Sequence, residues 1–159
     1  MTEPTELQKA IINDAIALRG GIITSYSQVE FLLADISVKL DLKFPYLVKD
    51  RIKAVKQIGQ RPGYEVYKAD LDKLCEELLQ YDEIRVFMAH GFLTVTTDKK
   101  GDHELEYRMY QRVGDGKFNL VLVKTTIPRL EAAAMQITKY VSDAVRLFGR
   151  IYNEQNLEG

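Results

Sequence analysis

The spacing of apolar residues predicts helices over most of the chain. A stripe with spacings of three and four predicts a first helix over about 5–18, formed by Leu7, Ile11, Ala15 and Leu18. Gly20-Gly21 predicts the end of this helix. Ser27 and Glu30 have the spacing of a capping box, so a second helix is expected from there to about residue 41. A short connection would make these two helices antiparallel neighbours.

Three further helices are expected along the chain. Phe44-Pro45 breaks the pattern, because the residue before a proline avoids the helical conformation, and a shorter helix follows over about 46–58. The next helix covers about 70–89, and a last long helix opens near Thr126. Arg85 falls on the apolar stripe of the 70–89 helix, which is an unusual position for arginine.

Between the last two helices the apolar period changes from 3.6 to 2, which predicts strands. Turns are expected at 98–102 and at 114–116. The second strand is expected to be half-buried, because Leu105, Tyr107, Met109, Gln111 and Val113 alternate with charged residues and a tyrosine. The pattern therefore predicts a three-stranded antiparallel meander at about 92–124.

Together these elements predict an α+β protein that is mainly α. We expect an antiparallel helical bundle with a small three-stranded antiparallel sheet before the last helix. No internal repeat, low-complexity stretch or linker divides the chain, so a single domain over 1–159 is expected, with the meander inserted at about 92–124.

Composition narrows the class of protein without naming a function. The chain has 159 residues, of which 46% are apolar and 28% are charged, as expected of a folded domain. No stretch approaches eighteen uninterrupted apolar residues, and the acidic N-terminus does not resemble a signal peptide. One cysteine, Cys75, excludes an intramolecular disulfide, and the carboxylates of Glu76 and Glu77 beside it favour an inert thiol. We therefore expect a cytoplasmic protein that does not associate with membranes.

Charge is balanced over the whole chain but uneven along it. The net charge of −1 argues against bulk, non-specific nucleic-acid binding. Residues 43–68, however, hold seven basic and two acidic side chains. This basic segment is either an anion-facing patch or an ordinary solvated helix face. Its central basic residues are Lys49, Arg51, Lys53, Lys56 and Arg61.

Few residues could carry chemistry. Of the two histidines, His103 is expected in a solvated hairpin turn, whereas His90 ends a helix just before Gly91, where the helix dipole favours the imidazolium. The chain has no glycine-rich phosphate loop with a lysine, no metal-ligand spacing and no serine in a nucleophile-elbow context. We therefore expect neither a metal nor a cofactor.

The stretch from Arg85 to His90 has the form Arg-x4-His and is followed by Gly91. It resembles the Arg-x4–6-His motif of the HEPN superfamily (higher eukaryotes and prokaryotes nucleotide-binding domains). Its place, at the end of the penultimate long helix with a final long helix to follow, also resembles the up-and-down bundle of that superfamily. The chain differs at Val86, where members usually carry a polar residue, and at Phe92, where the toxin–antitoxin variant carries a tyrosine.

The resemblance implies a metal-independent endoribonuclease of the toxin or abortive-infection kind, with an antitoxin protein as a partner. His90 would act as general acid or base while a ribose 2′-hydroxyl attacks the adjacent phosphorus, and Arg85 would stabilise the phosphorane oxygens. A homodimer would bring two motifs into one cleft. The basic segment would guide the RNA backbone, with three tyrosines as stacking surfaces, namely Tyr46, Tyr64 and Tyr67.

Two other interpretations are open on the sequence alone. The chain is a non-catalytic HEPN-like binding or scaffold module for a nucleotide or a protein partner, or it is a small structural or adaptor protein. In the last case Arg85 would pair with the Tyr81 hydroxyl or with a carboxylate of Asp82 or Glu83, and His90 would cap its helix.

Overall fold

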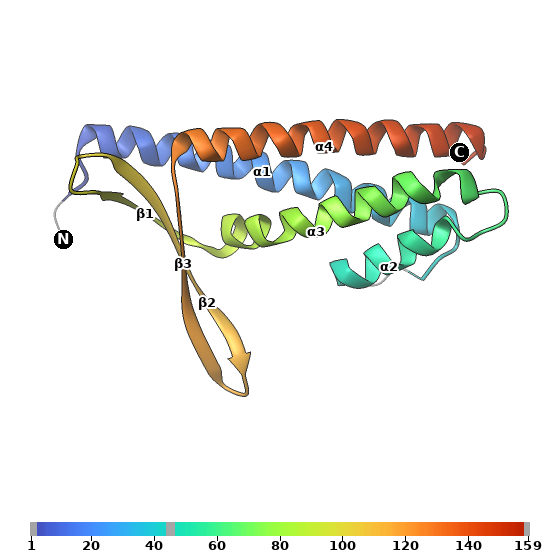
Figure 1. Cartoon of the computed structure of the whole chain (residues 1–159), viewed down its shortest axis with the longest axis horizontal. Coiled ribbons are helices and arrows are strands. Elements are labelled where there is room, and N and C mark those ends of the chain that lie inside the picture. Colours follow the sequence, from blue (N-terminus) through green and yellow to red (C-terminus); the bar gives the residue numbers. More distant parts are fainter. Residues whose placement is uncertain (1–2, 44–46, 158–159) are drawn as a thin grey trace. The chain divides into compact units, whose positions relative to one another are not determined.

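A computed structural model describes residues 3–43 and 47–157, and in these ranges it contains four α-helices and one three-stranded antiparallel sheet before the last helix (Figure 1). The protein is therefore α+β and mainly α, as the apolar pattern predicts. The elements in chain order are α1 (Glu6–Lys39), α2 (Val48–Ile58), the short 3-10 helix η1 (Glu65–Tyr67), α3 (Lys68–His90), β1 (Phe92–Thr97), β2 (His103–Gly114), β3 (Lys117–Thr125) and α4 (Ile127–Glu154).

The chain divides into two compact units. The helical unit comprises Ser25–Asp82 and Ile137–Gly159, and the sheet unit comprises Met1–Thr24 and Glu83–Gln136. Helices α1, α3 and α4 each contribute residues to both units. Among the described helices, none combines the length and the apolar character that crossing a bilayer requires.

The prediction of two helices before residue 42 is wrong, because α1 is a single helix from Glu6 to Lys39. Gly20 and Gly21 are exposed helical residues, and a Cβ on either would meet no atom within 4 Å. Each glycine costs a helix about 1 kcal/mol relative to alanine. A continuous buried stripe outweighs that cost, since a fully buried aliphatic side chain contributes roughly 1.5–3 kcal/mol. The stripe passes through both sides of the glycine pair and consists of Ala15, Ile22, Tyr26, Val29, Leu33 and Ile36.

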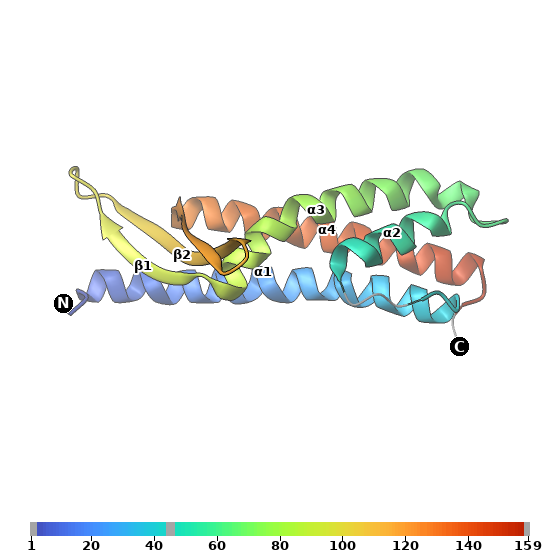
Figure 2. The same ribbon diagram turned by 90° about the horizontal axis from the view of Figure 1, so that it is seen from below.

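The helical unit has a continuous apolar core. Helix α2 confirms the short helix predicted there, although residues 44–46 lie outside the described ranges. It lies beside α3 in both views (Figures 1 and 2), and the Cys75 Sγ is 3.9 Å from the backbone oxygen of Ile52. Helix α4 is joined to α3 by the buried Tyr140 hydroxyl, which donates a hydrogen bond to the Leu74 carbonyl at 2.7 Å. Burial raises the pKa of Tyr140.

The sheet unit is built on a meander with the strand order β1-β2-β3. The register pairs Val95 with Leu105 and Tyr107 with Val123. Because directly opposed residues of an antiparallel pair lie on one face, these four side chains share the face that holds the buried Leu105 and Tyr107. The helices of this unit add the remaining buried apolar residues, namely Ala15, Ile22, Phe87, Met88 and Leu130.

The predicted burial of alternate residues holds only for the first half of β2. Leu105 and Tyr107 are buried, but Met109 is half-buried, and Gln111 and Val113 are exposed. Figure 1 shows why, since the β2–β3 hairpin runs on past the helices of its own unit. Glu106, expected on the solvent face, is instead 5% exposed and is paired with Arg108.

Candidate functional site

The two residues of the Arg-x4-His stretch lie on the last turns of α3, within the sheet unit. Arg85 is half-buried, and His90, the final residue of the helix, is exposed. Between them, Phe87 and Met88 are buried and hold this end of the helix in the core of the unit. Five positions along an α-helix correspond to a rotation of roughly 140° and a rise of about 7.5 Å. One chain therefore presents the imidazole and the guanidinium on different faces of the same helix.

The exit from the helix fixes the position of His90. The Gly91 N–H donates to the Phe87 carbonyl at 2.8 Å, and β1 begins at the next residue, Phe92. A Cβ at Gly91 would lie 2.5 Å from the Phe87 carbonyl oxygen and 3.2 Å from the Tyr107 Cβ, so only glycine fits without a shift. His90 is thus the last residue of α3, and Gly91 alone separates it from β1.

Arg19 of α1 is a residue of this site that sequence reasoning missed. Its Nη2 donates to the Ala89 carbonyl at 3.2 Å, which satisfies one of the carbonyls left free at a helix end. Arg19 also lies close enough to Tyr107 to oppose the rise in the pKa of that hydroxyl, which burial causes. The local pattern could not reveal this role, because Arg19 and Ala89 are separated by 70 positions.

A small cavity lies beside the same part of α3. It has a volume of about 250 Å³, and its lining includes Phe87, Met88, Tyr107 and Leu130. The lining is mostly apolar, with Glu83 and Arg129 as its charged residues. The buried Tyr107 hydroxyl has no hydrogen-bond partner among the described residues. The polar uncharged side chains of the lining are those of Tyr107 and Thr125, each of which carries a hydroxyl.

The five basic residues of the 43–68 segment belong to the helical unit, whereas Arg85 and His90 belong to the sheet unit. Four of the five contact a local acceptor. Arg51 lies 3.9 Å from Glu30, Lys53 lies 3.7 Å from Asp50, Lys56 lies 3.7 Å from Glu76, and Arg61 donates to the Leu40 carbonyl at 3.1 Å. Lys49 is exposed. These contacts fit a structurally engaged helix face, and a role in RNA guidance stays a prediction.

The tyrosines of this segment do not form the expected stacking surface. Tyr64 and Tyr67 are buried, at 9% and 1% exposure, so their ring faces are covered. The Tyr67 hydroxyl donates to Glu154 of α4 at 2.5 Å. The prediction for these two rings is therefore wrong, because the segment packs them into the helical core. Tyr46 lies outside the described residues.

The remaining polar candidates have structural roles. His103 is not in the turn but begins β2, where its Nδ1 lies 3.0 Å from the Thr97 Oγ1. The Asp98 carboxylate accepts the N–H groups of Lys100 and Asp102 at 2.8 and 2.9 Å and so shapes the β1–β2 turn. Within the described ranges, no three His, Cys, Asp or Glu side chains are grouped as ligands of a metal ion.

Cys75 is buried in the helical unit, and burial raises the pKa of its thiol to about 12. The raised pKa is consistent with the expectation of an inert thiol, but its main cause differs from the one expected. Desolvation is the largest effect, whereas the neighbouring carboxylate of Glu76 adds little, and Lys56 acts in the opposite direction.

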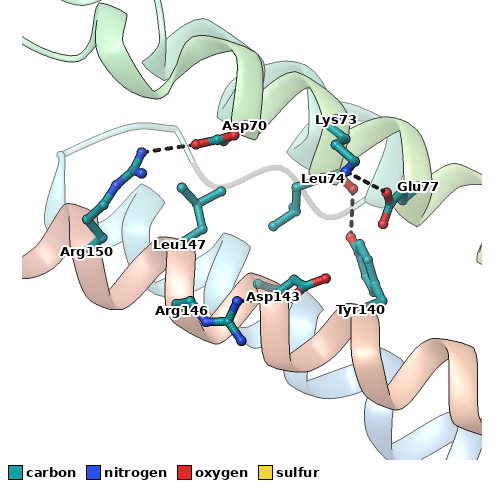
Figure 3. Close-up of a pocket in the computed structure, with 10 residues that line it drawn as sticks. Asp70, Lys73, Leu74, Glu77, Tyr140, Asp143, Arg146, Leu147 and Arg150 are labelled. Atoms are coloured by element: carbon teal, nitrogen blue, oxygen red, sulfur yellow. Dashed lines mark hydrogen bonds and ion pairs between the residues drawn. The ribbon is translucent and has the colours of Figure 1, made fainter.

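A larger groove of about 390 Å³ lies between α3 and α4 in the helical unit (Figure 3). Its charged residues neutralise one another, since Arg150 contacts Asp70 at 3.1 Å, Lys73 contacts Glu77 at 3.9 Å and Arg146 contacts Asp143 at 3.5 Å. The Asp143 carboxyl has a lowered pKa because Lys139 donates a hydrogen bond to it. With equal numbers of acidic and basic lining residues, the groove selects no ligand by charge.

Comparison with protein-family models, with curated proteins and with solved structures found no match for this chain.

Proposed function

We propose that this chain is a HEPN-like, metal-independent endoribonuclease that acts as a homodimer in the cytoplasm. The observation that carries the proposal is the exposed imidazole of His90, held at the end of α3 with Arg85 five positions earlier on the same helix. An exposed histidine is accessible to a large substrate, and an imidazole can both accept and donate a proton through its ring nitrogens. In the toxin-like form of this proposal, an antitoxin protein is the natural partner.

The proposed reaction is transesterification of RNA. The ribose 2′-oxygen forms a bond to the adjacent phosphorus while the bond from phosphorus to the 5′-oxygen breaks. The 2′-hydroxyl proton passes to a neutral imidazole, and a protonated imidazole returns a proton to the 5′-oxygen that leaves. The products are a 2′,3′-cyclic phosphate and a 5′-hydroxyl. The Arg85 guanidinium supports the negative charge that develops on the non-bridging oxygens.

The proposed reaction requires both a proton acceptor and a proton donor, and it requires an arginine and a histidine that face each other. Two copies of the chain would meet both requirements. One imidazole takes a proton and one gives a proton, whereas each chain has only one histidine at the end of α3. The rotation of roughly 140° between positions 85 and 90 also sends the two side chains of one helix apart. A second copy can place its own Arg85 or His90 opposite the first, so that the pair forms one composite cleft.

The test is cleavage of single-stranded RNA by the purified protein in the presence of EDTA. We expect the wild type to form 2′,3′-cyclic ends and His90→Ala to reduce kcat by about 100- to 10,000-fold. Arg85→Lys keeps the charge but loses the planar fork of donors, so a loss of about 100-fold is expected. An RNA with 2′-O-methyl groups should resist cleavage, because it has no 2′-hydroxyl to attack.

His103→Ala is the matched control, because it removes the other histidine of the same unit and should leave the rate within about twofold. Equal cleavage by wild type and His90→Ala would contradict the proposal. A folded wild type that leaves RNA intact would leave the non-catalytic binding module as the better account. Sedimentation at micromolar concentration tests the dimer, and a strict monomer would remove the composite cleft.

A further inference from the structure

The cavity of about 250 Å³ beside α3 belongs entirely to the sheet unit, since every residue of its lining falls within Glu83–Gln136. Its lining comes from strands β2 and β3, from the last turns of α3 and from the first turns of α4. The register pairs Tyr107 with Val123 and Leu105 with Thr125, so the strand residues of the lining share one face of the sheet. The cavity is therefore a feature of one compact unit.

The lining of this cavity changes from apolar to charged as its residues become more exposed. Its four buried residues are at most 6% exposed, namely Phe87, Met88, Tyr107 and Leu130. The half-buried part of the lining is also mainly apolar and consists of Ile84, Val123, Thr125 and Ala133. The two charged residues, Glu83 and Arg129, are exposed and have opposite signs. The cavity therefore offers an apolar interior without a net preference for an anion or a cation.

One polar group distinguishes this cavity from ordinary packing space. Tyr107 is fully buried, and its hydroxyl has no hydrogen-bond partner among the described residues. Side chains stand roughly perpendicular to a sheet, so the Tyr107 ring rises from the face that lines the cavity and carries the hydroxyl at its tip. Burial raises the pKa of this hydroxyl, which stays protonated and can both donate and accept. Folded proteins pair nearly all such buried groups, so a ligand with one hydrogen-bonding group would complete this site.

The size of the cavity and the rings in its lining narrow the class of ligand. An apolar cavity of about 150 Å³ holds benzene, so a cavity of about 250 Å³ suits a molecule of about ten non-hydrogen atoms. The rings of Phe87 and Tyr107 and the thioether of Met88 make favourable contacts with an aromatic ring. A charged group would lose its hydration in this apolar interior. These features select a small, neutral aromatic molecule.

We propose that this cavity binds a neutral aromatic molecule of one or two rings, whose single polar group forms a hydrogen bond with the Tyr107 hydroxyl. The ring of the ligand would lie against Phe87, Met88 and Leu130. Neither Arg85 nor His90 belongs to the lining of the cavity. Binding is measured without RNA, so this proposal is tested independently of the proposed nuclease.

Indole and indene are matched probes, because they have nearly the same size and shape but only indole carries an N–H donor. Titration of the wild type with indole should give saturable shifts in methyl NMR spectra, concentrated on Ile84, Val123 and Leu130. A Kd between about 10 μM and 1 mM is expected for a ligand of this size. Tyr107→Phe keeps the ring but removes the hydroxyl, so it should weaken indole binding by about three- to tenfold and leave indene binding within about twofold. The ratio of the two affinities cancels any general change in packing.

Two further hydroxyls serve as controls. Tyr110→Phe makes the same chemical change at an exposed tyrosine on the opposite face of β2. Thr125→Val replaces the other hydroxyl of the lining with a methyl group of similar size. Both variants should bind indole within about twofold of the wild type. An unchanged ratio of indole to indene affinity in Tyr107→Phe would overturn the proposal, as would a loss of indole binding in Thr125→Val that Tyr107→Phe does not show.

Filling the cavity checks where the probes bind. Ala133→Leu enlarges a half-buried side chain of the lining, so it should weaken the binding of both probes by at least about tenfold. Met135→Leu is its control, because Met135 lies on the same helix and is 75% exposed. Undiminished binding by a folded Ala133→Leu variant would refute the site, as would the absence of saturable shifts in the wild type or shifts of equal size in the helical unit. Tighter binding of indole-3-carboxylate than of indole would show that Arg129 selects an anion and would refute the neutral class.

Discussion

The two units of this chain divide their apolar residues differently between core and surface. Among the described residues, twenty buried apolar side chains belong to the helical unit and seven to the sheet unit. The sheet unit, by contrast, exposes Phe92, Tyr110 and Phe118 on one face of its sheet. It also holds both buried side-chain atoms that lack a hydrogen-bond partner in the described ranges, the Thr94 Oγ1 and the Tyr107 hydroxyl. The difference teaches that the larger apolar core lies in the helical unit, whereas more of the exposed large apolar side chains lie in the sheet unit.

Two phenylalanines give the largest expected contrast between the units. Phe148 of α4 is fully buried in the helical unit, whereas Phe118 of β3 is 59% exposed in the sheet unit. Phe148→Ala should lower the free energy of unfolding by about 3–5 kcal/mol, because it leaves a cavity in a packed core. Phe118→Ala should change it by less than about 0.5 kcal/mol. Urea unfolding followed by circular dichroism measures both, and similar losses would refute the contrast.

Gly91 tests how firmly the sheet unit holds His90. Gly91→Ala places a methyl group 2.5 Å from the Phe87 carbonyl oxygen, so either the helix end or the strand must move. A loss of about 1–3 kcal/mol in the free energy of unfolding is expected, together with a loss of RNA cleavage. Normal stability with normal cleavage would show that the joint between α3 and β1 tolerates a shift.

The free energy of unfolding at alkaline pH tests whether the Cys75 thiol is buried in the core of the helical unit. The folded-state pKa of this thiol, about 12, is raised above its ordinary value of 9.0, so folding favours the neutral form. The resulting stability is complete below pH 9 and is lost as pH rises toward 12, by up to about 1.4 kcal/mol per pH unit. Buried tyrosines add to the slope in any variant. Urea unfolding at several pH values should therefore give a shallower slope for Cys75→Ala than for the wild type, and equal slopes would contradict the assigned burial.

The smallest expected effect is a gain in stability. Gly20→Ala adds a methyl group to the exposed interior of α1 where no atom lies within 4 Å, so it should raise the free energy of unfolding by about 0.5–1 kcal/mol. Gly21→Ala should do the same. A thermal-shift assay detects the change. Destabilisation by either alanine would show that the helix has to break at the glycine pair.

The local sequence pattern was sufficient to predict those helices and strands for which the apolar spacing and the turn or capping residues indicate the same boundaries. The change of period after Gly91 predicts the three strands, and the apolar stripe over 70–89 predicts α3 to within two residues at its start. The glycine pair led to a wrongly predicted helix end, because intrinsic helix propensity contributes less free energy than the burial of a continuous apolar stripe. The correct signal was present in the spacing of Ile22 with Ala15 before it and Tyr26 after it, which carries one stripe through both glycines.

Contacts between segments that are distant in the chain, and the extent to which helices cover the sheet, could not be predicted from the sequence. The alternation of β2 predicts which face each residue takes, but not where the covering helices stop, so the exposure of Gln111 and Val113 was missed. The position of His90 at a helix end followed from its place before Gly91. The contact from Arg19 to the Ala89 carbonyl did not, because it joins segments that are distant in the chain. The burial of Tyr64 and Tyr67 was hidden for the same reason.

The free side of β3 has a consequence for the behaviour of the protein in concentrated solution. Among the described strands β3 pairs only with β2, so its other edge offers unpaired backbone groups to any passing strand. Its sequence from Phe118 to Val123 is apolar apart from Asn119 and contains no proline, which is the composition of segments that assemble into fibrils. Lys117 and Lys124 flank it as charged gatekeepers. Charge at the two ends of this strand therefore opposes edge-to-edge pairing, and replacing both lysines by neutral residues is expected to promote aggregation through that edge.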